Sequence, residues 1–138
     1  MAILPSGLPE NVADEEFLAR FLTQSNQFNK LMAKPVVFLQ SQKDRETSVF
    51  RHGPEPSGNL WAIGQSTAGD RKLYGATFFT ASSVRAIQLE VSADEPPQRH
   101  AVIRGWPWNE SDPELQKAEQ MKRAALIASK AELLLRDV

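Results

Sequence analysis

The hydrophobic positions of this chain change their spacing several times, so the pattern predicts both helices and strands. Residues 1–12 hold two prolines and a glycine without a sustained period, which is typical of an irregular leader. The next apolar residues, at helical steps of three and four, are Phe17, Leu18, Phe21 and Leu22. With Asp14 as a capping residue, this spacing predicts an N-terminal helix.

Short runs rich in β-branched and aromatic residues predict strands through the middle of the chain. The predicted strands are residues 36–39, 47–51, 74–80, 87–91 and 100–104. The first two are expected to pair as a hairpin across an intervening polar stretch. Ser57 is predicted to cap a short helix that ends near Gly64. Residues 81–86 form either a helical turn or a continuation of the third strand.

The longest helical pattern lies at the C-terminal end. Ser111 and Glu114 have the spacing of a capping box, and Pro113 suits a first helical turn. From there to Arg136 no glycine or proline interrupts the chain, so the helix is expected to continue to that residue. Its apolar stripe is predicted to be Ala118, Met121, Ala125, Ala128, Ala131 and Leu135. Two ion pairs are expected at i,i+4 spacing, Glu119–Arg123 and Glu132–Arg136.

The order of these elements predicts the fold class. Strands and helices do not strictly alternate, which favours an α+β fold over a parallel doubly wound one. We expect a mostly antiparallel sheet of about four to five strands, packed against the N-terminal helix and the long C-terminal helix. At 138 residues the chain fits one domain, which we place at residues 13–138 after the leader.

Composition excludes several classes of protein. Sixteen basic and seventeen acidic residues give a net charge of -1, so binding of nucleic acid would need a local patch and is not favoured. The chain has no cysteine and only two histidines, His52 and His100, which lie far apart in sequence. We therefore expect no metal and no cofactor. Because no apolar run is long enough for a membrane span and the first residues lack a signal-peptide pattern, we expect a cytoplasmic protein without a membrane partner.

Catalytic sequence motifs are missing from the chain. It has no phosphate-binding loop, no dinucleotide fingerprint, no nucleophile elbow and no paired zinc-binding histidines on a helix. The spaced glycines of residues 64–69 lack the lysine that a phosphate loop needs, so this segment is interpreted as a surface loop. The adjacent carboxylates Asp94 and Glu95 are expected to be solvated in a proline-rich turn.

The segment from Arg99 to Trp108 concentrates side chains that recognise ligands. If Ala101 and Ile103 face the core, the opposite face carries His100, Val102 and Arg104. The candidate binding residues of this segment are Arg99, His100, Arg104 and Trp106. Arginine and tryptophan together can stack on a base or hold a phosphate. The interpretation that we favour for the tryptophans is structural, namely that they cover the junction of the sheet and the long helix.

Arg51 is a fifth candidate, at the end of the second predicted strand. If it points inward it must be paired, either to a bound anion or to a carboxylate of the protein. The interpretation that we favour is an exposed arginine at the end of a hairpin. His52, which precedes a glycine and a proline, is expected to be a turn residue.

Several ordered motifs resemble those of a family of small bacterial proteins. The motifs are Ser48-Val49-Phe50-Arg51, Trp61, Gly64, Tyr74-Gly75-Ala76, Pro96-Pro97-Gln98-Arg99-His100-Ala101 and Ile103-Arg104-Gly105-Trp106-Pro107. The resemblance extends over about residues 14 to 130 and implies a self-contained bacterial domain. Since the family carries no known activity, the resemblance implies no cofactor, partner or site residue.

Three hypotheses about function follow from these observations. The first is a non-catalytic binding or accessory module that recognises a protein partner or a small anionic ligand near the candidate residues. The second is a small enzyme acting on nucleotides or nucleic acids, with His100 as acid or base and Arg51, Arg99 and Arg104 as a phosphate clamp. It requires Arg51 and His100 to meet in one cleft. The third is a homo-oligomeric structural component, such as a homodimer formed through the long helix or a free strand edge.

Overall fold

The computed structural model describes residues 2–53 and 60–136, and within these ranges six strands form a single antiparallel sheet. The strands are β1 (Phe17–Leu22), β2 (Thr47–Gly53), β3 (Gly75–Thr80), β4 (Glu90–Ala93), β5 (His100–Arg104) and β6 (Glu132–Leu135). Their order across the sheet is β4-β5-β2-β1-β3-β6. The predicted α+β class with an antiparallel sheet is confirmed, with six strands where four to five were expected.

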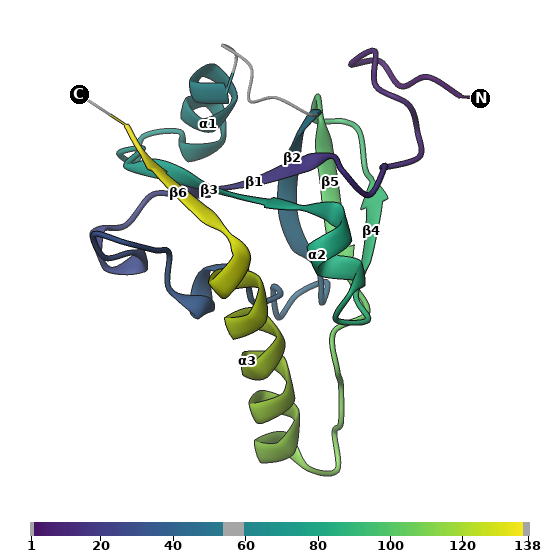
Figure 1. The fold of residues 1–138 in the computed structure, drawn as a ribbon, viewed down its shortest axis with the longest axis vertical. Helices are drawn as coiled ribbons and strands as arrows, with labels where there is room; N and C mark the ends of the chain where they lie inside the picture. The colour runs from purple at the N-terminus through teal and green to yellow at the C-terminus, as the bar shows by residue number, and fades with distance from the viewer. Residues whose placement is uncertain (1, 54–59, 137–138) are drawn as a thin grey trace.

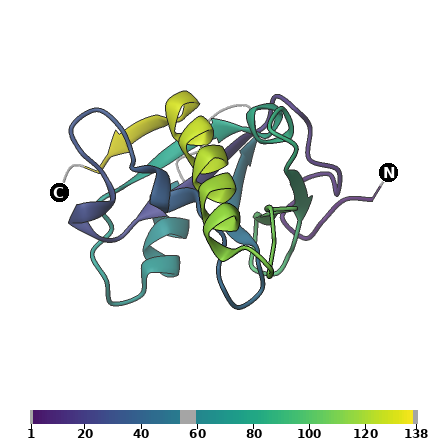
Figure 2. The ribbon, with the colours of Figure 1, turned by 90° about the horizontal axis from the view of Figure 1, so that it is seen from below.

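Three α-helices and two 3-10 helices complete the described part of the chain. They are η1 (Ser25–Gln27), η2 (Pro35–Phe38), α1 (Leu60–Ala68), α2 (Ala81–Arg85) and α3 (Pro113–Lys130). Figure 1 shows α1 and α3 on opposite sides of strands β3 and β6. Figure 2 shows α3 lying across the sheet. The two faces of the sheet are therefore covered by different helices.

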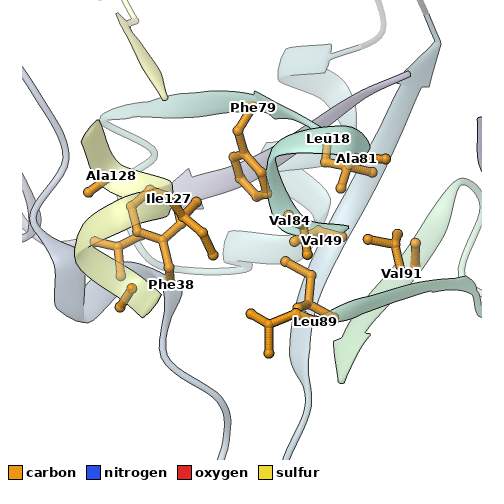
Figure 3. Close-up of a cluster of buried hydrophobic side chains, with 14 of the residues drawn as sticks. Leu18, Phe38, Val49, Phe79, Ala81, Val84, Leu89, Val91, Ile127 and Ala128 are labelled. Carbon is orange, nitrogen blue, oxygen red and sulfur yellow. The ribbon is translucent and has the colours of Figure 1, made fainter. Parts of the chain in front are cut away.

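The larger core lies between the sheet and α3. Strand residues such as Leu18, Val49 and Phe79 meet Ile127 of α3 and Phe38 of η2 in this cluster. Figure 3 shows Phe38 beside Ile127, and the rings of Phe38 and Phe79 meet edge to face at 5.4 Å. Burying side chains of this size stabilises the fold by about 1.5–3 kcal/mol each. We call this side of the sheet the covered face.

A smaller core forms on the opposite side, where α1 packs over β1 and β3. Leu60 of α1 is buried there with Ala19 and Phe78, and Trp61 packs against the same cluster. Gly64 allows the close approach of the helix, because a Cβ at this position would lie 2.7 Å from the ring of Phe21. Helix α1 leaves room beside it over β2 and β5, and we call this side the groove face.

The predicted N-terminal helix is wrong, because residues Phe17–Leu22 form strand β1. This strand lies between β2 and β3, so both of its sides are covered. Leu18 and Leu22 enter the larger core, while Phe17, Ala19 and Phe21 belong to the smaller one. A strand that is apolar on both sides has apolar residues at adjacent positions, and this pattern also contains helical steps.

The predicted strand at residues 36–39 is also wrong, and with it the hairpin to residues 47–51. Pro35 begins the 3-10 helix η2, whose Val37 and Phe38 are buried against the larger core. Strand β2 pairs with β1 and β5 instead. A short apolar run can be a buried helical turn as easily as a strand, and here a proline at the first position favours the turn.

The C-terminal helix begins where expected but ends early. Asp112, rather than Ser111, caps it by accepting a hydrogen bond from the backbone N–H of Leu115. It ends at Lys130, and the following residues Glu132–Leu135 pair with β3 as strand β6. Gly75 permits this pairing, because a Cβ there would lie 2.4 Å from the carbonyl oxygen of Leu134. The extra strand explains why the sheet is wider than predicted.

The buried side of α3 also differs from the predicted stripe. Its buried residues are Gln120, Ala124, Ile127 and Ala128, whereas Ala118 and Ala125 are exposed. The predicted pair Glu119–Arg123 is confirmed at 3.2 Å. The second pair does not form on a helix because Glu132 and Arg136 lie beyond its end.

The remaining elements follow the predictions more closely. Strand β5 has the predicted bounds, and residues Ala81–Arg85 take the helical alternative as α2. Strand β4 starts three residues later than predicted, at Glu90. Helix α1 continues past Gly64 to Ala68, so the interpretation of residues 64–69 as a surface loop is wrong for all but Gly69. The predicted cap Ser57 lies outside the described residues.

Candidate functional site

Three adjacent cavities line the groove face and share residues at their borders. The first, of about 460 Å³, is lined by Arg20, Leu39, Gln40, Ser41, Asp44, Glu46, Ser48, Asp94, His100 and Val102. The second, of about 120 Å³, shares Arg20 and Ser48 with it. The third, of about 300 Å³, shares Phe50 and Thr67 with the second and extends to Arg99. We call the three cavities together the sheet groove.

A hydrogen-bonded chain of three side chains lies at the border of the first cavity. The Nε2 atom of His100 is 2.5 Å from the hydroxyl oxygen of Ser48. The Nδ1 atom of His100 is 3.2 Å from a carboxylate oxygen of Asp94 and 3.0 Å from the carbonyl oxygen of the same residue. The three residues come from β2, β5 and the turn after β4, and we call them the Ser48–His100–Asp94 cluster.

The register of the sheet brings this cluster together. Phe50 and His100 are paired on neighbouring strands, and their rings meet at 5.4 Å on the groove face. Ser48 lies two residues before Phe50 on β2, so its side chain emerges on the same face. The tight β4–β5 connection, in which Asp94 donates its backbone N–H to the His100 carbonyl, places the carboxylate on the other side of the imidazole.

Arg20 lies beyond the point where the β1–β2 pairing ends, at Ala19 and Phe50. Its Nε donates to the carbonyl of Val37 at 2.9 Å and its Nη1 to the carbonyl of Ser48 at 2.9 Å. Burial lowers the pKa of the Arg20 guanidinium below its ordinary value. A cation held by carbonyl oxygens in a partly desolvated position interacts strongly with any nearby anion.

Arg71 and Arg99 line the second and third cavities. Arg71 donates to the carbonyls of Ala68 and Thr67 and to the hydroxyl of Thr23. Arg99 donates to the carbonyl of Arg51 at 3.1 Å. Like Arg20, both are bonded only to neutral oxygens in the part of the chain that the structure describes.

The other arginines are mostly paired with carboxylates. Within residues 2–53 and 60–136, ion pairs form between Arg45 and Glu110, Arg51 and Glu16, Arg85 and Asp14, Arg104 and Glu46, and Arg123 and Glu119. Arg136 donates to the amide of Gln65. The sheet groove therefore holds three of the four arginines that lack a described ion pair, in a chain whose net charge is -1.

A further polar group in the first cavity is unsatisfied. Gln40 is 6% exposed, and its side-chain oxygen has no hydrogen-bond partner among the described residues. A buried amide oxygen without a partner costs free energy, because it has lost its hydrogen bonds to water. A ligand that donates a hydrogen bond in this cavity would satisfy it.

Arg51, a predicted candidate, lies on the covered face. Its side chain is fully buried, with Nε 2.5 Å and Nη2 2.9 Å from the carboxylate oxygens of Glu16. Its Nη1 donates to the carbonyl of Pro9 at 2.7 Å. Because Arg51 and His100 emerge on opposite faces of the sheet, the phosphate clamp that required them in one cleft does not form. Arg51 is paired inward to a carboxylate of the protein, so the exposed position that the sequence favoured is wrong and the inward alternative is right.

Two further candidates also have structural contacts within the protein, one by packing and one by an ion pair. Trp106 is 6% exposed and belongs to the larger core together with Ala124 of α3. Arg104 pairs with Glu46 at 2.6 Å beside the first cavity. Of the five candidates, the structure brings His100 and Arg99 to the sheet groove and places the other three outside its open cavities or in ion pairs.

His52 is a buried strand residue rather than a turn residue. It is 3% exposed, and neither ring nitrogen has a hydrogen-bond partner among the described residues. Burial, followed by the positive charge of Arg99, lowers the pKa of His52 to about 4. The imidazole is therefore neutral at physiological pH and packs as an apolar ring against Phe78.

Sequence reasoning missed Ser48, Asp94, Arg20, Gln40 and Arg71. Strand alternation around Val49 already places Ser48 on the side opposite the core, which is the one signal available for it. The partners of a strand, and hence the meeting of Ser48 with His100, depend on a pairing that no local pattern records.

Comparisons with known proteins identify no relative of this chain. No protein-family model matches the chain, and no curated protein or solved structure matches it either. None of the helices in residues 2–53 and 60–136 is long and apolar enough to cross a membrane. The bacterial origin, the cytoplasmic location and the homodimer stay predictions.

Proposed function

We propose that this protein is a binding module that holds a small anionic ligand in the sheet groove. The observation that carries the proposal is the set of three arginines, Arg20, Arg71 and Arg99, that line the groove and, among the described residues, bond only neutral oxygens. An arginine offers forked N–H donors that match a carboxylate or phosphate group. Cavities of about 120 to 460 Å³ suit a small molecule better than the surface of a folded protein.

The charges along the groove favour one orientation of the ligand. Arg71 and Arg99 lie in the second and third cavities, whereas the first cavity also carries the carboxylates of Asp44 and Asp94. An anionic group is therefore stabilised away from the first cavity, and a neutral or hydrogen-bond-donating part is stabilised within it. Gln40 supports this orientation because its buried side-chain oxygen has no described partner and can accept a hydrogen bond from the ligand.

Isothermal titration with inorganic phosphate, citrate and a nucleoside monophosphate tests the proposal. We expect at least one of these anions to bind the wild-type protein and the affinity to fall about tenfold or more in Arg71→Gln and Arg99→Gln. A charge-assisted hydrogen bond contributes about 1.5–3 kcal/mol, and about 1.4 kcal/mol corresponds to tenfold. Arg85→Gln is the matched control, because this arginine pairs with Asp14 outside the groove.

Two results would overturn the proposal. One is the absence of heat or chemical-shift change with every anion at millimolar concentration. The other is equal affinity of wild-type protein, Arg71→Gln and Arg99→Gln for an anion that binds, since the arginines would then make no contact with it. Salt dependence provides a second readout, because an ion pair with the ligand weakens as ionic strength rises.

A further inference from the structure

The Ser48–His100–Asp94 cluster has the order of a hydrolytic triad. A hydroxyl, an imidazole and a carboxylate follow one another at 2.5 and 3.2 Å, within reach of direct hydrogen bonds. Such a triad is recognised by geometry and by the role of each group rather than by order in the chain, so the absence of a sequence motif does not weigh against it.

The contacts of His100 determine which of its nitrogens carries the proton. Its Nδ1 faces two oxygens of Asp94, a carboxylate and a carbonyl, and both of these only accept hydrogen bonds. Nδ1 must therefore be the N–H donor. In the neutral imidazole Nε2 then holds a free lone pair, and this atom is the one that faces the hydroxyl of Ser48.

The need to satisfy buried polar groups does not explain why these three side chains are hydrogen-bonded to one another. Ser48 is exposed and the side chain of Asp94 is 53% exposed, so water can satisfy both groups without the imidazole. The cluster also borders the largest cavity of the sheet groove, where a reacting group can reach the serine oxygen. The guanidinium of Arg20 lies on the other side of Ser48, bonded to its carbonyl.

We infer that Ser48 is a nucleophile activated by His100 and Asp94, and that the sheet groove hydrolyses small carboxylic esters that carry an anionic group. The substrate class rests on the proposed function, because the groove arginines hold the anionic part while the ester lies in the first cavity. Arg20 supplies positive charge beside Ser48, where negative charge develops on the carbonyl oxygen of the ester.

The reaction proceeds in two balanced halves. The Ser48 oxygen bonds to the carbonyl carbon while its proton passes to Nε2 of His100, and the bond to the alcohol oxygen then breaks as Nε2 returns the proton to that oxygen. Water next bonds to the acyl carbon and gives a proton to Nε2. The bond to Ser48 breaks, and the serine oxygen regains the proton. The sum is ester plus water giving acid plus alcohol.

Covalent labelling with an alkyl fluorophosphonate tests the nucleophile directly, because the reagent bonds to serines that a neighbouring base activates. We expect one adduct per folded wild-type chain, located on Ser48 by peptide mass spectrometry, and none in Ser48→Ala. Labelling is expected to slow about 100-fold or more in His100→Gln, the lower range of what a general base contributes. Asp94→Asn tests the positioning of the imidazole. Ser129→Ala removes an exposed serine of α3 and should label like the wild type.

Ester hydrolysis provides the second measurement. The 4-nitrophenyl monoester of succinic acid carries the required carboxylate, and 4-nitrophenyl acetate is its neutral counterpart. We expect kcat/KM to be at least about tenfold higher for the anionic ester, and this preference to fall in Arg71→Gln through KM. Urea unfolding of each variant verifies that it is folded.

The outcomes separate this inference from the proposed function. Folded wild-type protein that shows no adduct on Ser48, or equal labelling rates in wild type and His100→Gln, overturns the nucleophile even if phosphate binds the groove. If Ser48 is labelled but no anion binds, the proposal of an anionic ligand is rejected, whereas the assignment of Ser48 as a nucleophile is kept. Equal kcat/KM for the two esters rejects the substrate class.

Discussion

The backbones of Arg51 and Arg99 are hydrogen-bonded to each other, but their side chains lie in different surroundings. The backbone N–H of Arg51 donates to the carbonyl of Arg99 at 2.8 Å, and the Arg99 side chain donates to the carbonyl of Arg51. Strand alternation nevertheless sends the guanidinium of Arg51 to the covered face, where Glu16 pairs with it. Arg99 remains half-buried at the sheet groove without a described carboxylate partner.

The polar groups of the two faces differ in what they contact. On the covered face, the arginine is desolvated and its donors are taken up by a carboxylate and by carbonyls of the N-terminal segment. On the groove face, Arg71, Arg99 and His100 keep contact with open cavities. Residue type alone does not distinguish these cases, because the guanidinium pairs with a carboxylate in one and borders an open cavity in the other.

Breaking the ion pair of the covered face should have the largest effect on stability. Glu16→Ala leaves the Arg51 guanidinium buried without its carboxylate, so we expect the free energy of unfolding to fall by about 3–5 kcal/mol. Urea unfolding followed by circular dichroism measures this loss. The double variant Glu16→Leu with Arg51→Met replaces both charges with apolar groups and should recover most of it. A loss below about 1 kcal/mol for Glu16→Ala would contradict the structural role of the pair.

His52 should make stability depend on pH. The unfolded chain takes up the imidazole proton near pH 6.5, whereas the folded protein does so only at about 4. Between these values the unfolded state binds more protons, so the free energy of unfolding rises with pH, by about 3 kcal/mol in total, and levels off above pH 6.5.

His52→Leu provides the comparison for this pH dependence. It keeps an apolar side chain of similar size and should remove the rise that His52 contributes between pH 4 and 6.5. Urea unfolding of both proteins at half-unit steps of pH measures the difference. Parallel curves would show that the imidazole is already protonated in the fold, or is not buried there.

The next largest effect on stability is expected where α1 packs against the sheet at Gly64. In Gly64→Ala the new methyl group would lie 2.7 Å from Phe21 and 2.9 Å from Leu73. Overpacking of this kind costs about 1–3 kcal/mol, partly offset by the higher helix propensity of alanine, worth about 1 kcal/mol. Thermal unfolding checks the loss, with the exposed Ser66→Ala on the same helix as control. Equal stability of the two variants would indicate that α1 shifts freely.

The smallest effect on stability is expected from Arg104→Gln at the border of the groove. Its pair with Glu46 is 43% and 26% exposed, and exposed ion pairs contribute about 0–1 kcal/mol. Urea unfolding should therefore place this variant within about 1 kcal/mol of the wild type, and high salt should narrow the gap. If Arg104→Gln lowered the free energy of unfolding as much as Glu16→Ala, the ion pairs of the two faces would not differ in their contribution to stability.

The sequence predicted only some of the residues of the candidate site. His100 and Arg99 stood out because a histidine and an arginine end a proline-rich turn beside an apolar strand. Ser48 and Asp94 did not, because an ordinary serine on a strand and a carboxylate in a turn are each explained without chemistry. Their significance comes from the β2–β5 register and the tight β4–β5 connection, which together place both at the imidazole of His100.

Local patterns by themselves determined the α+β class, strand β5 and the start of α3. These features depend on capping residues, prolines and short runs of β-branched residues, whose preferences act within a few positions. Tertiary structure decided the rest. Strand β1 exists because partners cover both of its sides, and β6 exists because Gly75 lets the chain end approach β3. The meeting of Ser48 with His100, and the separation of Arg51 from both, depend on strand pairing between distant segments, which is set by burial of the whole sheet.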